Sequence, residues 1–90
     1  MPVRVKIPTQ LREATGGEST AAVDGGTVGE VLDALYSQYG ELRSRIAEDG
    51  GLRRFVNVYV GGEDIRFLQG LETPVRDGDE VTILPAVAGG

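Results

Sequence analysis

Residues 27–40 read TVGEVLDALYSQYG, and this stretch carries the strongest secondary-structure signal in the chain. Its apolar residues recur at the i, i+3, i+4, i+7 spacing of one helix face. These residues are Val28, Val31, Leu32 and Leu35, with Tyr39 one turn further. Thr27 and Glu30 match the Ser/Thr-x-x-Glu capping box, in which the hydroxyl accepts the N–H of Glu30 and the Glu30 carboxylate reaches back to the N–H of Thr27. We expect a helix that Gly40 ends as a C′ residue.

Strands are predicted on both sides of this helix. In chain order they cover Val3–Ile7, Glu18–Val23, Phe55–Val60, Ile65–Phe67 and Glu80–Leu84. The first two form a hairpin across a connection at Leu11–Gly17. The third is β-branched and aromatic throughout, which predicts a central strand. Pro85 ends the last one, and Leu42 and Ile46 predict a further short helical turn before the central strand.

This order of elements predicts an α+β fold, with a mixed sheet of four to five strands and one main helix packed on one face. The helix stripe is expected to pack against apolar residues of three strands, namely Val3, Val5, Ile7, Val56, Val58, Val81 and Ile83. Ninety residues accommodate one such core. We place the domain at residues 1–84 and a flexible C-terminal tail at residues 85–90.

The composition excludes most catalytic chemistry. The chain has no Cys, His or Trp, so thiol nucleophiles, disulfides, zinc sites with thiolate or imidazole ligands, and Ser-His or Cys-His pairs are ruled out. Fourteen acidic and nine basic residues give a net charge of −5, which argues against nucleic-acid binding. No apolar run approaches the ~18 residues of a membrane span, and no signal peptide is evident. We expect a cytoplasmic protein that is not an enzyme and has no membrane partner.

Two motifs that suggest ligands have simpler explanations. Asp77-Gly-Asp-Glu80 offers three carboxylates within four residues, as a calcium site would, but a turn before a strand accounts for the same residues. Gly26-Thr-Val-Gly29 before a helix partly matches a dinucleotide-binding turn, but the first glycine is missing, there is no room for a parallel βαβ unit, and a turn with a helix cap accounts for the same residues. We expect no metal site, no bound cofactor and no catalytic residue.

A partner surface is predicted on the strand at residues 55–60. Phe55, Asn57 and Tyr59 alternate with its valines and therefore project from the face that the helix leaves uncovered. Together with Arg54 they form a candidate docking surface, and the alternative is that loops cover them.

The tail is the most informative feature. After Pro85 come Ala86-Val87-Ala88-Gly89-Gly90, with no charge and no side chain larger than valine. Six residues extend roughly 20 Å, enough to enter another protein's active site. Glycine lacks a Cβ, so the carboxylate of Gly90 can pass through a narrow channel. The alternative is an apolar tail without function.

With these motifs in place, the chain resembles the ubiquitin-like β-grasp sulfur carriers, which include the small subunit of molybdopterin synthase and the thiamin-pathway sulfur carrier. The resemblance covers essentially the whole chain. It is carried by DGDEVTILPAVAGG at residues 77–90, by RFVNVYV at residues 54–60 and by EDIRF at residues 63–67. Within the family, the chain looks most like the carriers of actinobacterial cysteine biosynthesis.

The resemblance implies a covalent carrier on which partner enzymes act. An E1-like enzyme consumes ATP to adenylate Gly90, and sulfide or a persulfide displaces AMP to leave a thiocarboxylate. Residues 85–89 carry this group into partner active sites. In the cysteine route, the sulfur attacks an aminoacrylate on a PLP-dependent cysteine synthase, and a metalloprotease releases cysteine after an S-to-N acyl shift.

Other functions remain open on the sequence. A molybdopterin synthase subunit, or a sulfur donor for another thio-metabolite, has the same kind of tail. A protein modifier would join Gly90 to a lysine of a target protein instead of to sulfur. A plain interaction module would not need Gly90.

Overall fold

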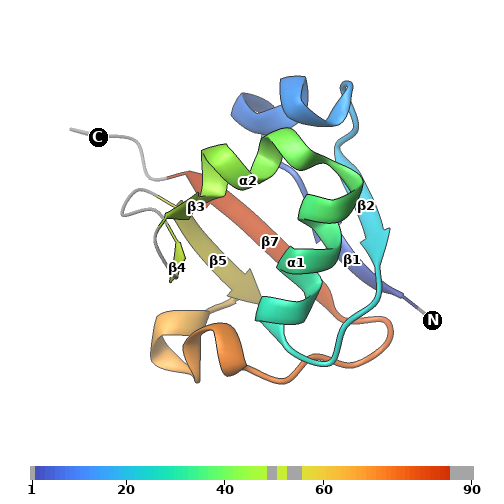
Figure 1. The fold of residues 1–90 in the computed structure, drawn as a ribbon. Coiled ribbons are helices and arrows are strands. Elements are labelled where there is room, and N and C mark those ends of the chain that lie inside the picture. Colours follow the sequence, from blue (N-terminus) through green and yellow to red (C-terminus); the bar gives the residue numbers. More distant parts are fainter. Residues whose placement is uncertain (1, 49–50, 53–55, 86–90) are drawn as a thin grey trace.

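Five strands form one mixed sheet in the order β2-β1-β7-β5-β6 (Figure 1). The strands are β1 (Val3–Lys6), β2 (Thr20–Val23), β5 (Val56–Val60), β6 (Glu63–Asp64) and β7 (Glu80–Pro85). β1 runs antiparallel to β2 and parallel to β7, and β5 runs antiparallel to β7 and β6. The computed structural model describes residues 2–48, 51–52 and 56–85. The predicted α+β fold with a mixed sheet is therefore confirmed.

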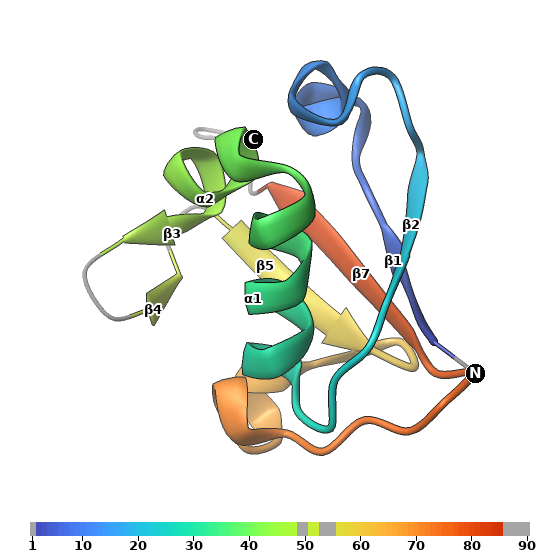
Figure 2. The same cartoon turned by 45° about the vertical axis from the view of Figure 1, so that its right-hand side comes forward.

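The helices lie on one face of this sheet, as the two views in Figures 1 and 2 show. α1 (Val28–Gln38) crosses the sheet and α2 (Gly40–Ile46) follows it. Three 3₁₀ helices cover Thr9–Thr15, Ile65–Phe67 and Gly70–Glu72. β3 (Ala47–Glu48) and β4 (Gly51–Leu52) pair as a separate antiparallel ribbon. No helix in the described part of the chain is long and apolar enough to cross a membrane.

The core lies between the helices and the sheet. The helix stripe is buried as predicted, and so are all but one of the strand residues expected to face it, namely Val3, Val5, Ile7, Val58, Val81 and Ile83. Val56 is only half-buried. Leu42 and Ile46 of α2 are fully buried, so the second helix contributes as much to the core as a turn of α1.

The predicted cap of α1 is half correct. The Thr27 hydroxyl accepts the backbone N–H of Glu30 at 3.2 Å, as the capping box requires. The Glu30 carboxylate instead accepts the N–H of Gly26 at 2.7 Å, one residue before the expected donor. The Glu30 carboxylate therefore binds the glycine turn before the helix and not the N–H of Thr27.

Gly40 does not end α1 as predicted. The helix stops because Tyr39 leaves the helical region with φ −130° and ψ 83°, and Gly40 is the first residue of α2. The N–H of Tyr39 donates to the carbonyl of Leu35, and the N–H of Leu42 donates to the carbonyl of Tyr39. The two helices therefore meet at a corner, and Gly40 needs no left-handed conformation.

Two other segments differ from the prediction. Ile65–Phe67 forms a 3₁₀ helix and not a strand, because the Asp64 carboxylate accepts the N–H of Arg66 at 2.8 Å and turns the chain. The strand pairing there falls instead on β6, which lies between the two predicted strands. The connection at residues 11–17 contains most of a 3₁₀ helix, Thr9–Thr15, which buries Leu11.

The strand predicted at residues 55–60 is internal, as expected, with β7 and β6 as its neighbours, and β7 is the middle strand of the sheet. β7 pairs with β1 on one side and with β5 on the other, so it is the middle strand of five. It also runs one residue further than predicted, because Pro85 pairs with Val56 as its last residue. A proline tolerates this place at a strand end, where no ladder hydrogen bond from its nitrogen is needed.

Candidate functional site

Three of the predicted site residues are described by the structure, and they lie on β5 and β7. Pro85 closes the strand opposite Val56, and Asn57 is the register partner of Leu84. Asn57 and Tyr59 are half-buried on β5. Ala86, Val87, Ala88, Gly89 and Gly90 lie outside the described residues, and so do Arg54 and Phe55. The structure thus describes the base of the predicted tail and half of the predicted docking surface.

A short turn at residues 76–79 comes directly before β7 and holds its first residue beside β1. Gly78 takes φ 88°, a conformation that favours glycine, and its N–H donates to the carbonyl of Pro2 at 3.2 Å. The Asp79 carboxylate accepts the N–H of Arg76 at 2.8 Å, and the N–H of Arg4 donates to the Asp79 carbonyl at 3.0 Å. This turn joins β7 to β1 and sets the register of the whole strand.

The sheet face away from α1 and α2 has no helix over it in either view (Figures 1 and 2). We define the open face by the outward residues of four strands, which are Arg4, Lys6, Thr20, Ala22, Asn57, Tyr59, Glu80, Thr82 and Leu84. Leu84 keeps 45% of its surface exposed, an unusual value for a leucine in a central strand. The prediction that Asn57 and Tyr59 lie on the face opposite the helix agrees with this arrangement.

Charged side chains contact each other at two places on or beside the open face. Lys6 Nζ lies 3.5 Å from Glu80 Oε1, with both side chains about half exposed. Next to β6, at the edge of the sheet, the Arg66 guanidinium contacts the Asp64 carboxylate at 2.8 Å and Asn57 Oδ1 at 2.7 Å. The hydrogen bonds from the Arg66 side chain and backbone hold the pKa of Asp64 below its ordinary value of 3.8.

Asp64 and Arg66 were not among the predicted site residues. Their signal in the sequence is an aspartate two residues after a Gly-Gly pair, with an arginine two residues later. An aspartate in that place commonly accepts a backbone N–H two residues on, and Arg66 then lies beside the same carboxylate. Sequence alone does not show that Asn57, nine positions earlier, completes the cluster.

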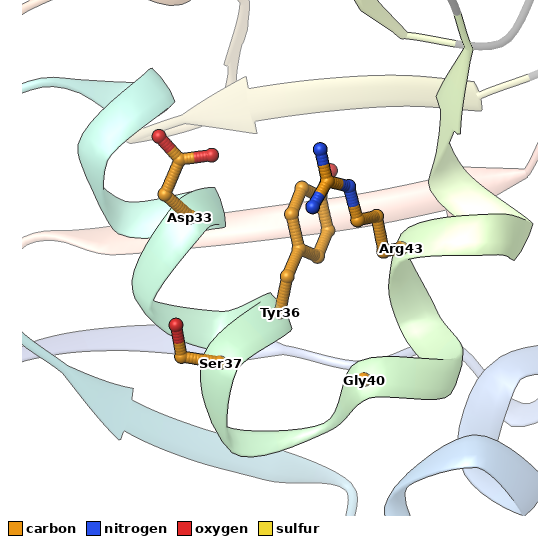
Figure 3. Close-up of a pocket in the computed structure, with 5 residues that line it drawn as sticks. All are labelled: Asp33, Tyr36, Ser37, Gly40 and Arg43. Carbon is orange, nitrogen blue, oxygen red and sulfur yellow. The ribbon is translucent and has the colours of Figure 1, made fainter.

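A shallow groove of about 510 Å³ lies on the helical side, between α1 and α2 (Figure 3). Its walls are Asp33, Tyr36 and Ser37 of α1 together with Gly40 and Arg43 of α2. Burial raises the pKa of Tyr36 to about 12; the Asp33 carboxylate acts in the same direction and Arg43 opposes it. The hydroxyl therefore stays protonated at neutral pH and cannot act as a base. Pro85, Asn57 and Tyr59, the predicted site residues that the structure describes, do not line this groove.

The two alternative ligand motifs have their polar groups engaged within the fold. In the turn before β7, Asp79 is bound to the N–H of Arg76, and among the described residues no group of three potential ligands is placed to hold a metal ion. Around the start of α1, three backbone N–H groups that a phosphate could meet are engaged. Gly26 donates to Glu30, Glu30 donates to Thr27, and Val28 donates to the carbonyl of Thr73 at 3.0 Å.

Comparison with known proteins covers the whole chain. Residues 5–90 match the ThiS family. The chain is 50% identical to the sulfur carrier protein CysO of Mycobacterium tuberculosis over 93 residues, and the match covers all of both chains. It is 37% identical to the small archaeal modifier protein 3 of Haloferax volcanii over 92 residues, again with both chains covered fully.

A solved structure gives the same result at the level of the fold. The crystal structure of the Amycolatopsis orientalis BexX/CysO complex contains a chain that superposes with a TM-score of 0.92 at 51% identity, covering 98% of this chain and 99% of that one. The β-grasp fold expected from the resemblance is therefore confirmed.

Proposed function

The chain belongs to the ThiS family of ubiquitin-like proteins, and from this we propose that it is a sulfur carrier that bears sulfur on Gly90. The observation that carries the proposal is the 50% identity to a named sulfur carrier over the full length of both chains. The family match extends through residue 90, so it includes the Gly89-Gly90 ending.

The proposed chemistry is acyl activation followed by sulfur transfer. A carboxylate oxygen of Gly90 attacks the α-phosphorus of ATP, pyrophosphate leaves, and an acyl adenylate forms. Sulfide then attacks the acyl carbon, and AMP leaves as the C–S bond forms. An E1-like adenylyltransferase and sulfurtransferase supplies the catalytic groups and consumes the ATP. This chain binds no cofactor in the proposal and contributes the acyl group.

Cysteine is the proposed product of the pathway. The thiocarboxylate sulfur attacks an aminoacrylate held by a PLP-dependent cysteine synthase, and the thioester rearranges by an S-to-N acyl shift. A metalloprotease then hydrolyses the new amide, which releases cysteine and regenerates the Gly90 carboxylate. The likeness to CysO proteins supports this pathway over molybdopterin synthesis.

The base of the tail suits this role. β7 is paired with β1 through Thr82 and with β5 through Pro85, so the five residues that follow start from a paired strand. Five extended residues reach about 17 Å. The open face lies beside this starting point, and Asn57, Tyr59 and Leu84 on it, together with Arg54 and Phe55, are the proposed docking residues. That a CysO protein has been crystallised in a complex with BexX supports a function through partners.

Mass spectrometry tests the proposal directly. The chain is incubated with ATP, its activating enzyme and sulfide, and we expect the mass change of one oxygen replaced by sulfur. Fragmentation should assign that change to Gly90. A chain that keeps its original mass while a control carrier is converted by the same enzyme would disprove the proposal.

Covalent protein modification is the second candidate function. The match to a small archaeal modifier protein over the full length of both chains favours it. In that function the activated Gly90 acylates a lysine amine of a target. The same incubation with cell extract distinguishes the two, because a modifier yields Gly90–lysine isopeptides.

A further inference from the structure

Two neighbours fix the Arg66 guanidinium at the edge of the open face. Nε lies 3.2 Å from each carboxylate oxygen of Asp64, and Nη2 lies 2.8 Å from Asp64 Oδ2. Nη2 also donates to Asn57 Oδ1 at 2.7 Å. The same Asp64 carboxylate binds the backbone N–H of Arg66. The guanidinium is therefore held in one orientation although 67% of the side chain is exposed.

This arrangement leaves one side of the guanidinium unused. An arginine side chain has five N–H donors. Asp64 and Asn57 engage those of Nε and Nη2, whereas the two donors of Nη1 have no acceptor among residues 2–48, 51–52 and 56–85. A fixed cation with two free donors is suited to a carboxylate on another molecule.

Its position relates Arg66 to the tail. Asn57 is the register partner of Leu84, and Val56 is the partner of Pro85, where β7 ends. β7 lies along one edge of β5, and Arg66 reaches Asn57 from the other edge, where β6 lies. Arg66 is therefore separated from the base of the tail by one strand, β5. A partner that binds Arg66 would therefore also be close to where the tail begins.

The charge around Arg66 favours an acidic partner. The chain carries a net charge of −5, but the open face with its edge has three cations, Arg4, Lys6 and Arg66. Its two carboxylates are already engaged, Glu80 with Lys6 and Asp64 with Arg66. Three cations against two carboxylates give these residues a net charge of +1, whereas the whole chain carries −5, so this side is less acidic than the rest of the molecule and suits a partner surface that bears carboxylates.

We propose that Arg66 is a recognition residue for the activating enzyme and donates through Nη1 to a carboxylate on its surface. The proposal rests on the function proposed above. Because Asp64 and Asn57 already hold the side chain in place, little side-chain freedom is lost when the contact forms. The contact would fix how the open face sits on the enzyme while the tail enters its active site.

The test measures binding to the activating enzyme without ATP, at low and at high salt. Arg66→Ala is expected to weaken binding about tenfold or more, as loss of a hydrogen bond to a charged group does, and to reduce the dependence on salt. Arg66→Lys keeps the charge but loses the planar geometry, so it should remain several-fold weaker than wild type. Arg45→Ala, which removes an exposed arginine from α2 on the other side, is the matched control and should bind like wild type.

Melting curves of all three variants establish that they are folded, and Arg66→Lys keeps the test valid if Arg66→Ala is not. Equal binding of wild type and both Arg66 variants, with normal adenylation of Gly90, overturns this inference and leaves the proposed function intact. A wild-type chain that neither binds nor is adenylated overturns both. Loss of self-association alone in Arg66→Ala also overturns the inference, because the occupant would then be a second copy of this chain.

Discussion

The two faces of β7 differ although their residues alternate along one strand. Val81 and Ile83 have no exposed surface and lie under α1, whereas Thr82 is half-buried and Leu84 is 45% exposed on the open face. The covered face removes apolar surface from water and so stabilises the fold. The open face retains an apolar residue at the base of the tail. The difference teaches that neighbouring residues of one strand differ in how much they contribute to the core, so residues of the open face can be changed with little effect on stability.

The largest expected effect comes from the tail itself. Removing Gly90 should abolish adenylation and leave the melting temperature unchanged, because the core ends with β7. The measurement is adenylate formation with the activating enzyme, beside a melting curve of the same sample. AMP transfer to the shortened chain would show that Gly90 is not the site of adenylation. A large fall in melting temperature would show that the tail also contributes to the stability of the fold.

A pair of adjacent substitutions tests the two faces directly. Ile83→Ala should destabilise the protein by about 2–5 kcal/mol, since it leaves a cavity under α1. Leu84→Ala should cost less than about 1 kcal/mol, because half of that side chain is already in water, and should instead weaken binding to the activating enzyme. Chemical denaturation and binding assays of both variants check this. Similar losses of stability would mean that the open face is also structural.

The cap of α1 offers a smaller change on the covered side. Thr27→Ala removes the hydroxyl that accepts the Glu30 N–H and should cost about 1 kcal/mol of stability. Thr27→Ser keeps the acceptor and serves as the control. Activation of Gly90 should be unchanged in both, and a variant that melts normally but reacts slowly would contradict the division between the faces.

The smallest expected effect is a dependence of stability on pH at the edge of the open face. Because the folded-state pKa of Asp64 is lowered, its bond to Arg66 stabilises the fold above pH 3.8 and this contribution is lost as the pH falls through the lowered value. The difference in unfolding free energy between wild type and Asp64→Asn should therefore be largest near neutral pH and vanish in strong acid. A constant difference across that range would mean that the carboxylate charge does not matter.

Local patterns in the sequence predicted the elements that depend on local contacts. The apolar spacing of residues 28–35 and the hydroxyl of Thr27 were sufficient for α1 and its cap. The alternation of β1 and β7 identified the buried side of each strand, and the family motifs pointed to the tail. These signals come from periodicities of a single helix or strand, which tertiary contacts seldom override.

What was missed depends on particular side-chain contacts, some local and some between separate strands. Ile65–Phe67 alternates like a strand, yet Phe67 is 87% exposed. The Asp64 carboxylate accepts the N–H of Arg66 and caps a 3₁₀ helix there, so no strand forms. Gly40 is a plausible helix end by residue type, but the corner is made at Tyr39, whose half-buried ring packs against the core. The Arg66 cluster needs Asn57 beside β6, a pairing that no local pattern predicts.

The middle place of β7 also bears on how the protein is made. β1 and β5, on either side of it, have no partner along those edges until residues 80–85 have been synthesised, and unpaired edges promote aggregation. A chain released from the ribosome before that point lacks the centre of its sheet and cannot close its core around Val81 and Ile83. Proteases remove such unfolded chains continuously. Chains that survive this quality control are therefore those in which translation has already passed residues 80–85.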